Sequence, residues 1–207
     1  MRVKHLFSVW ALLLFAVPAW ADNISTFVIE PTHTQVRFQW DHFGFSTPGA
    51  NFDEVEGEII INEAHPNKSS VSVGIPVKSV NTHVPALDEH LLTDRTFFQP
   101  EEHPYITYKS VKIRNLDVDD KTFDLKGEIT INGITKPVTL NSRITKVGPH
   151  PMWNNTRAIG VDATTTLKRS DFKMDAHAPY VSDELKVSIT LEAIEKEGYL
   201  KALENAQ

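Results

Sequence analysis

The stretch ITINGITKPVTL, residues 129–140, decides the fold of this protein. Apolar and polar residues alternate on both sides of the central pair Asn132-Gly133, and such alternation is typical of a half-buried β-strand. An Asn-Gly pair between two alternating runs favours a type I′ turn, because both residues tolerate positive φ. Residues 123–142 are therefore predicted to form a β-hairpin. Pro137 has no N–H group, so its strand should lie at a sheet edge or contain an irregularity.

The same alternation extends over most of the chain. Within residues 105–113 the apolar positions change from Ile106 and Tyr108 to Val111 and Ile113, and this shift by one residue indicates a bulge or bend. About eight strands in a chain of this length, largely antiparallel, favour a sandwich or a closed barrel. The predicted strands are residues 34–40, 55–61, 70–80, 105–113, 121–131, 134–144, 156–167 and 184–194.

Two regions break the strand pattern. The segment ALDEHLL, residues 86–92, could form one or two helical turns, because Leu87 and Leu91 are spaced at i and i+4. The C-terminal tail, residues 196–207, carries a weak amphipathic pattern that fits either a short helix or a frayed end. The sequence shows no internal repeat and no low-complexity linker, so a single domain is expected, with its core at about residues 26–195.

The N-terminus has the pattern of a secretory signal peptide. Arg2 and Lys4 precede a short apolar run, and the segment ends in an Ala-x-Ala site at Ala21. The apolar run is shorter than the ~18 residues expected of a membrane span. We therefore expect that residues 1–21 are removed and that residues 22–207 reach the periplasm without an integral membrane span. Retention of the segment as an anchor is the alternative.

Composition narrows the classes of function. The chain has no cysteine, which excludes thiol catalysis, CxxC redox chemistry and thiolate metal sites. Its formal net charge is −6 and it has no basic block, so nucleic acid is not an expected partner. A hydrophobic core has to supply the stability that disulfides supply in many exported proteins.

Motifs of enzymes and metal sites are missing from the sequence. There is no G-x-S-x-G, no H-E-x-x-H and no G-x-x-x-x-G-K-[ST] pattern. The neighbouring acids Glu101 and Glu102 would point to opposite sides of a strand, so they do not form a facing pair. Arg169 and Asp171 are interpreted as a local ion pair that closes a turn. Neither catalysis, nor a metal, nor a cofactor is expected.

Five stretches in order resemble the YceI family of periplasmic bacterial proteins. The resemblance covers about residues 26–195. Asp88, His90 and Leu91 match a motif that is common in the family, whereas Leu87 stands where that motif has a basic residue. The stretches are HTQVRFQWDHFGFS, ALDEHLLTDRTFFQPEEHPYITYKS, LKGEITINGITKPVTL, TTTLKRSDFKM and VSDELKVSITLEAI.

The resemblance implies an all-β fold, an extended eight-stranded antiparallel lipocalin-like barrel with a short helical segment between strands. It also implies a non-catalytic protein that binds, and carries or sequesters, an apolar amphiphile in a tunnel. The expected ligand is a polyisoprenoid, an isoprenoid quinone or a fatty-acid derivative. We expect the polar head of this ligand to contact His42, Asp88 or His90. The residues expected to contact its tail are Val36, Phe38, Trp40, Phe43, Phe52, Ile59, Val73, Ile75, Leu91, Phe97, Phe98, Ile106 and Tyr108.

Three alternatives stay open at the level of the sequence. The first is a periplasmic enzyme that uses His90 with Asp88 on a lipid-like substrate. The second is an outer-membrane barrel, against which the outward charges of Arg37 and Lys78 argue. The third alternative concerns assembly, because the sequence is compatible with a homodimer.

Overall fold

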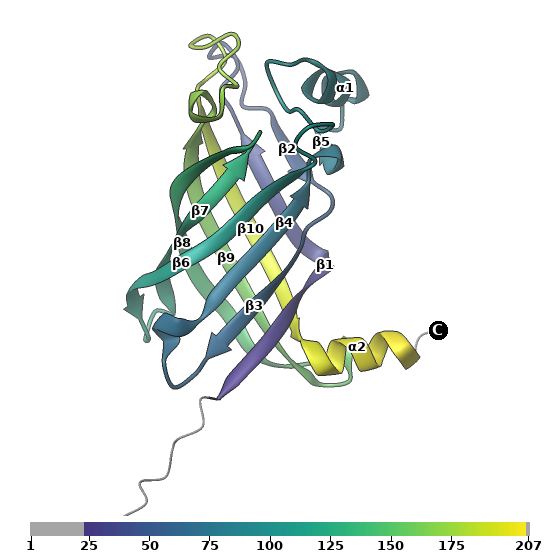
Figure 1. Cartoon of the computed structure of the whole chain (residues 1–207), viewed down its shortest axis with the longest axis vertical. Coiled ribbons are helices and arrows are strands. Elements are labelled where there is room, and N and C mark those ends of the chain that lie inside the picture. The colour runs from purple at the N-terminus through teal and green to yellow at the C-terminus, as the bar shows by residue number, and fades with distance from the viewer. Residues whose placement is uncertain (1–22, 206–207) are drawn as a thin grey trace, which may run out of the picture.

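The structure is a computed structural model that describes residues 23–205. It is a tall barrel of strands, with helix α1 beside one end and helix α2 beside the other (Figure 1). The strands are β1 (Ile24–Gln39), β2 (Gly49–Phe52), β3 (Glu56–Asn62), β4 (Ser70–Pro76), β5 (Val80–Asn81), β6 (Tyr105–Asp117), β7 (Thr122–Ile131), β8 (Ile134–His150), β9 (Thr156–Lys168) and β10 (Glu184–Glu195). The helices are α1 (Pro85–Thr93), α2 (Lys196–Asn205) and the 3₁₀ turns η1 (Pro66–Lys68), η2 (Val77–Ser79), η3 (Pro151–Trp153) and η4 (Arg169–Phe172).

Eight of the described strands close into an antiparallel barrel, as expected. Their order is β10-β9-β8-β7-β6-β4-β3-β1, and pairing of β10 with β1 closes the circle. The first half of β1 pairs with β3, and its second half pairs with the short strand β2, which in turn pairs with β5. A register shift between Glu30 and Gln35 separates the two halves of β1.

The predicted hairpin is confirmed. Asn132 and Gly133 have φ of 49° and 72°, as a type I′ turn requires. The Asn132 side chain donates to the carbonyl of Phe97 at 2.8 Å and accepts from the backbone N–H of Gln99 at 3.2 Å. A Cβ at Gly133 would lie 2.6 Å from Cε1 of His103, and its φ of 72° is a backbone conformation that favours glycine. The tip of the hairpin is thereby fastened to the loop that follows α1.

Pro137 lies in an irregular part of the barrel wall. Strand β8 stands between β7 and β9, but its pairing with β9 stops at Asn141 and Thr164. The stretch before Asn141 pairs with β7 only. Because alternate residues after a two-residue turn face the partner strand, the Pro137 nitrogen points toward β9, where it has no hydrogen to donate. The irregularity predicted from this proline is therefore present.

The structure changes three local predictions, which concern Val77, Val111 and Arg169. Val77, expected in a strand that ran to residue 80, begins the 3₁₀ turn η2, in which the N–H of Val80 donates to the carbonyl of Val77. The predicted bulge in β6 is confirmed by a register shift between Ser110 and Lys112, but the extra residue is Val111, which is 70% exposed.

The expected pairing of Arg169 with Asp171 is wrong. Arg169 is buried and donates to the backbone carbonyls of four residues, whereas Asp171 lies 3.8 Å from Lys136. A guanidinium carries five donors, so one buried arginine can hold several carbonyls of a folded loop. The four carbonyls belong to Met174, Ala176, Val181 and Ser182.

The two helical regions are as the sequence allowed. ALDEHLL lies within α1, and the tail forms α2 rather than a frayed strand end. Among the described residues no helix has the length and apolar character needed to cross a bilayer. The expected signal peptide falls outside the described residues.

Candidate functional site

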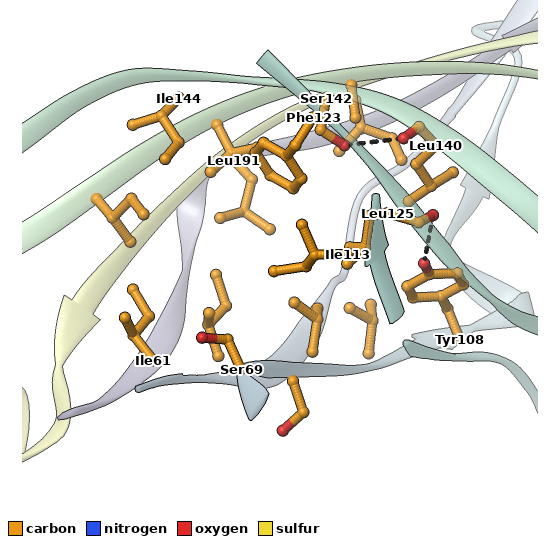
Figure 2. A pocket seen from close by; sticks show the side chains of 18 of the residues that line it. Ile61, Ser69, Tyr108, Ile113, Phe123, Leu125, Leu140, Ser142, Ile144 and Leu191 are labelled. Carbon is orange, nitrogen blue, oxygen red and sulfur yellow. Dashed lines mark hydrogen bonds between the residues drawn. The ribbon is translucent and has the colours of Figure 1, made fainter. Parts of the chain in front are cut away.

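A cavity of about 610 Å³ lies inside the barrel. This volume falls within the ~300–1,000 Å³ typical of sites for small molecules. Figure 2 shows that aliphatic and aromatic side chains point into it from opposite walls. Every strand of the closed barrel contributes to the lining. One lining residue per strand, from β1 through β10, is Val36, Ile59, Val73, Ile106, Leu125, Ile144, Val161 and Ile189.

The polar groups deep in the cavity are already engaged by the backbone. The Tyr108 hydroxyl donates to the carbonyl of Leu125 at 3.2 Å, and the Ser142 hydroxyl donates to the carbonyl of Leu140 at 3.2 Å (Figure 2). Burial raises the pKa of Tyr108, so the phenol stays neutral at physiological pH. A Cβ at Gly127 would lie 2.6 Å from the Tyr108 ring, so this glycine makes room for the ring. The interior therefore presents apolar surface.

One end of the cavity is open, and we call it the mouth. It is bounded by the β3–β4 connection, the β6–β7 turn and the end of β8, on the side of α2 (Figure 1). Three apolar residues both line the cavity there and face solvent: Leu116 at 47%, Val118 at 76% and Val147 at 47% exposure. The charged residues of the cavity lining, among those described, also lie at the mouth: Glu63, Asp117 and Lys121.

The opposite end is filled by aromatic rings. The rings of Phe52 and Phe38 have centroids 5.5 Å apart, Phe52 and Phe98 5.9 Å, and Phe38 and Trp40 5.8 Å. We call these four residues the aromatic plug. Leu91 of α1 is buried in the same cluster. Because rings at such distances leave little free space, the cavity ends below them.

The structure separates the expected tail contacts into two groups. Six of them line the cavity. They are Val36, Ile59, Val73, Ile75, Ile106 and Tyr108. The other seven do not line it, because they pack against one another or face solvent at the closed end. These are the plug residues Phe38, Trp40, Phe52 and Phe98, together with Phe43, Leu91 and Phe97. The assignment of either group to a ligand stays a prediction.

The expected head-group residues also lie away from the cavity lining. Asp88 accepts hydrogen bonds from the N–H and the hydroxyl of Thr82, at 2.7 and 2.6 Å, and so fastens the start of α1. His90 stands edge-on to Phe97 at 5.1 Å, and His42 edge-on to Phe43 at 4.7 Å. Asp88 and His90 belong to α1, which lies beside the end of the barrel opposite the mouth (Figure 1), and their assignment to a ligand head group stays a prediction.

A second polar cluster sits at the register shift of β1. Ligand atoms of Glu30, His33 and Glu192 lie within 4.8 Å of one another, a donor set that could hold a metal ion. The two oxygens of Glu30 already accept four hydrogen bonds from Thr32 and His33. Burial raises the pKa of Glu30, but those bonds outweigh it and hold the pKa below its usual value. Hydrogen bonding to Glu30, and then its charge, raise the pKa of His33. We interpret the cluster as a brace for the bend in β1.

Fold and cavity together define the class: a closed eight-stranded antiparallel barrel with an apolar internal cavity. Within this class, the chain belongs to the YceI family, because the model of the YceI-like domain matches residues 27–193. Among curated relatives, a UPF0312 protein of Pectobacterium atrosepticum is 32% identical over 165 residues, 80% of this chain and 83% of that protein. Protein YceI of Escherichia coli is 31% identical over 167 residues, 81% and 84% of the two chains.

Solved structures agree on the fold. The YceI protein of Campylobacter jejuni has a TM-score of 0.64 and 26% identity, covering 75% of this chain and 89% of that one. BcnA of Burkholderia cenocepacia has a TM-score of 0.69 at 17% identity, covering 79% and 98%. A polyisoprenoid binding domain from Saccharophagus degradans has a TM-score of 0.59 at 16% identity, covering 82% and 98%.

Proposed function

We propose that this protein binds, and carries or sequesters, an apolar amphiphile with its tail inside the barrel. The observation that carries the proposal is the continuous apolar cavity, open to solvent at the mouth and closed by the aromatic plug. Each methylene that leaves water for such a cavity contributes about 0.8 kcal/mol before ordering costs. A prenyl or acyl tail can therefore bind tightly with few polar contacts.

Polyisoprenoids, isoprenoid quinones and fatty-acid derivatives are the ligand classes that fit. The name of the Saccharophagus degradans neighbour, a polyisoprenoid binding domain, supports the first of these. The periplasm is the proposed location, on the evidence of the sequence pattern of residues 1–21. A binding role without catalysis and without a cofactor fits best, because Asp88 and His90, the pair considered for an enzyme, lie outside the lining of the cavity.

Mass spectrometry of lipid extracted from the protein, purified from its own host, tests this proposal directly. A cavity-filling variant gives the matched comparison. Ala163 on β9 is buried and faces the cavity, whereas its neighbour Thr164 is exposed on the outer face. Ala163→Trp should lower the amount of bound lipid at least tenfold, and Thr164→Trp should leave it unchanged. Thermal unfolding of both variants checks that each is folded. Equal lipid in Ala163→Trp and wild type, or a wild type that carries none and binds no added isoprenoid, would overturn the proposal.

A further inference from the structure

The barrel wall is interrupted between β8 and β9. Their pairing ends at Asn141 and Thr164, and beyond this point β8 pairs only with β7 and β9 only with β10. A second pocket of about 390 Å³ occupies the gap. It is lined by Lys136, Pro137, Val138, Thr139, Thr165, Thr166, Leu167, Lys168, Asp171 and Phe172. We call this gap the side window.

The side window borders the central cavity. Val138, Thr165 and Leu167 line both the window and the cavity. Thr139 and Thr166, which follow them in sequence, line the window without lining the cavity. Since neighbouring residues of a strand face opposite sides of a sheet, the window is lined by residues of both faces of the wall.

Pro137 lies within the unpaired part of β8. Its nitrogen faces β9 and cannot donate, so at its own position, which the register would place opposite Lys168, no β8–β9 hydrogen bond can form. The groups of β8 that face β9 before Asn141 have no partner in that strand.

The window and the mouth differ in charge. The window has two lysines, Lys136 and Lys168, and one carboxylate, Asp171, which lies 3.8 Å from Lys136. The mouth has one lysine, Lys121, and two carboxylates, Asp117 and Glu63, of which Glu63 is paired with Arg157. The mouth therefore has no excess of positive charge, and an anionic group connected to a tail in the cavity is favoured at the window.

We propose that the side window holds the head group of the bound amphiphile, and that this head group is anionic, a phosphate or a carboxylate. This inference rests on the proposed function. The tail extends from the window through the cavity toward the mouth. Lys136 and Lys168 contact the head group and provide the specificity for its negative charge.

Two probes with one tail test the charge. Farnesyl phosphate and farnesol share a C15 tail and differ in the anion, so the ratio of their dissociation constants isolates the head-group contribution. The double variant Lys136→Gln/Lys168→Gln should lower the preference for farnesyl phosphate, by up to about fivefold per lysine, and leave farnesol binding unchanged. Lys121→Gln at the mouth is the matched control and should leave the ratio unchanged.

The outcomes separate the two proposals. Farnesol binding with a ratio unchanged in the double variant, or a ratio that falls in Lys121→Gln instead, would overturn the head-group site and leave the binding function standing. If wild type bound neither probe, the proposed function itself would fail, and the head-group site with it.

Thiol labelling locates the head group independently, because the natural chain has no cysteine. Thr166 and Thr164 are both exposed on β9, but only Thr166 lines the window. Saturating farnesyl phosphate should slow maleimide labelling of the Thr166→Cys variant severalfold and leave labelling of Thr164→Cys unchanged. Equal rates at Thr166→Cys with and without the probe would place the head group elsewhere.

Discussion

The two ends of the barrel are built from the same alternating strands, yet one is filled and the other is open. At the closed end, Phe38, Phe52 and Phe98 meet with ring centroids less than 6 Å apart. At the mouth, Leu116, Val118 and Val147 reach the surface and leave the cavity accessible. In this barrel the size of the side chains at inward positions, and not the pattern of the strands, determines which end is filled and where the cavity begins.

The largest expected effect is on the closed end. Phe52→Ala should lower the free energy of unfolding by about 3–5 kcal/mol, because it removes a buried ring between two other rings. Val118→Ala at the mouth should change it by less than about 0.5 kcal/mol, because Val118 is 76% exposed. Urea denaturation of both variants provides the measurement. Similar losses at both sites would contradict the contrast between the ends.

Arg169 is expected to give the next largest effect. It folds the β9–β10 connection over the closed end by donating to four backbone carbonyls. Arg169→Gln should cost about 2–4 kcal/mol, because it removes charged donors and leaves carbonyls unsatisfied. Arg169→Lys, which keeps the charge but not the planar set of donors, should recover only part of the loss. Full recovery by lysine in urea denaturation would show that the charge alone matters.

A smaller effect is expected on ligand entry. Val118→Asp introduces a charge at the apolar rim of the mouth, so transfer of farnesol from phosphatidylcholine vesicles to the protein should slow by about threefold to fivefold. Phe45→Asp is the control, since Phe45 is 92% exposed but lies in the connection between β1 and β2, which is flanked by the plug residues Trp40 and Phe52. Stopped-flow fluorescence would measure both rates. If Phe45→Asp slowed transfer more than Val118→Asp, entry would take place at the closed end.

The smallest effect concerns the brace in β1 and depends on pH. The lowered pKa of Glu30 stabilises the fold above its ordinary pKa of 4.5, and this stabilisation is lost as pH falls through the folded-state pKa. The raised pKa of His33 stabilises the fold below its ordinary pKa of 6.5, and this is lost as pH rises through the folded-state pKa. The joint contribution is therefore greatest between pH 4.5 and 6.5.

The His33 side chain is half exposed, so its contribution should stay below about 1 kcal/mol. Wild type should lose this amount relative to His33→Gln as pH rises above 6.5 and through the higher folded-state pKa of His33. Urea denaturation of both proteins at several pH values checks the difference. Parallel stability curves for the two proteins would rule out the brace as a source of pH dependence.

Much of the fold could be predicted from particular residues. Asn132-Gly133 specified a hairpin through local backbone preference, and the phase shift after Tyr108 specified a bulge. The candidate site was predicted only in part. Phe38 and Ile106 were both identified as inward-facing, but one belongs to the plug and the other to the cavity lining. Several lining residues of β7, β9 and β10 have the same inward-facing position in the alternating pattern, but they are not among the predicted tail contacts.

The strands, their turns and the face that each residue presents follow from the sequence alone, because they depend on the period of the chain and on local backbone chemistry. Which inward positions meet other side chains and which meet free space depends on the tertiary fold. That outcome rests on residues far apart in sequence, such as Phe52 and Phe98, which come together only when the barrel closes. The side window likewise depends on where the pairing of β8 with β9 ends, at Asn141 and Thr164.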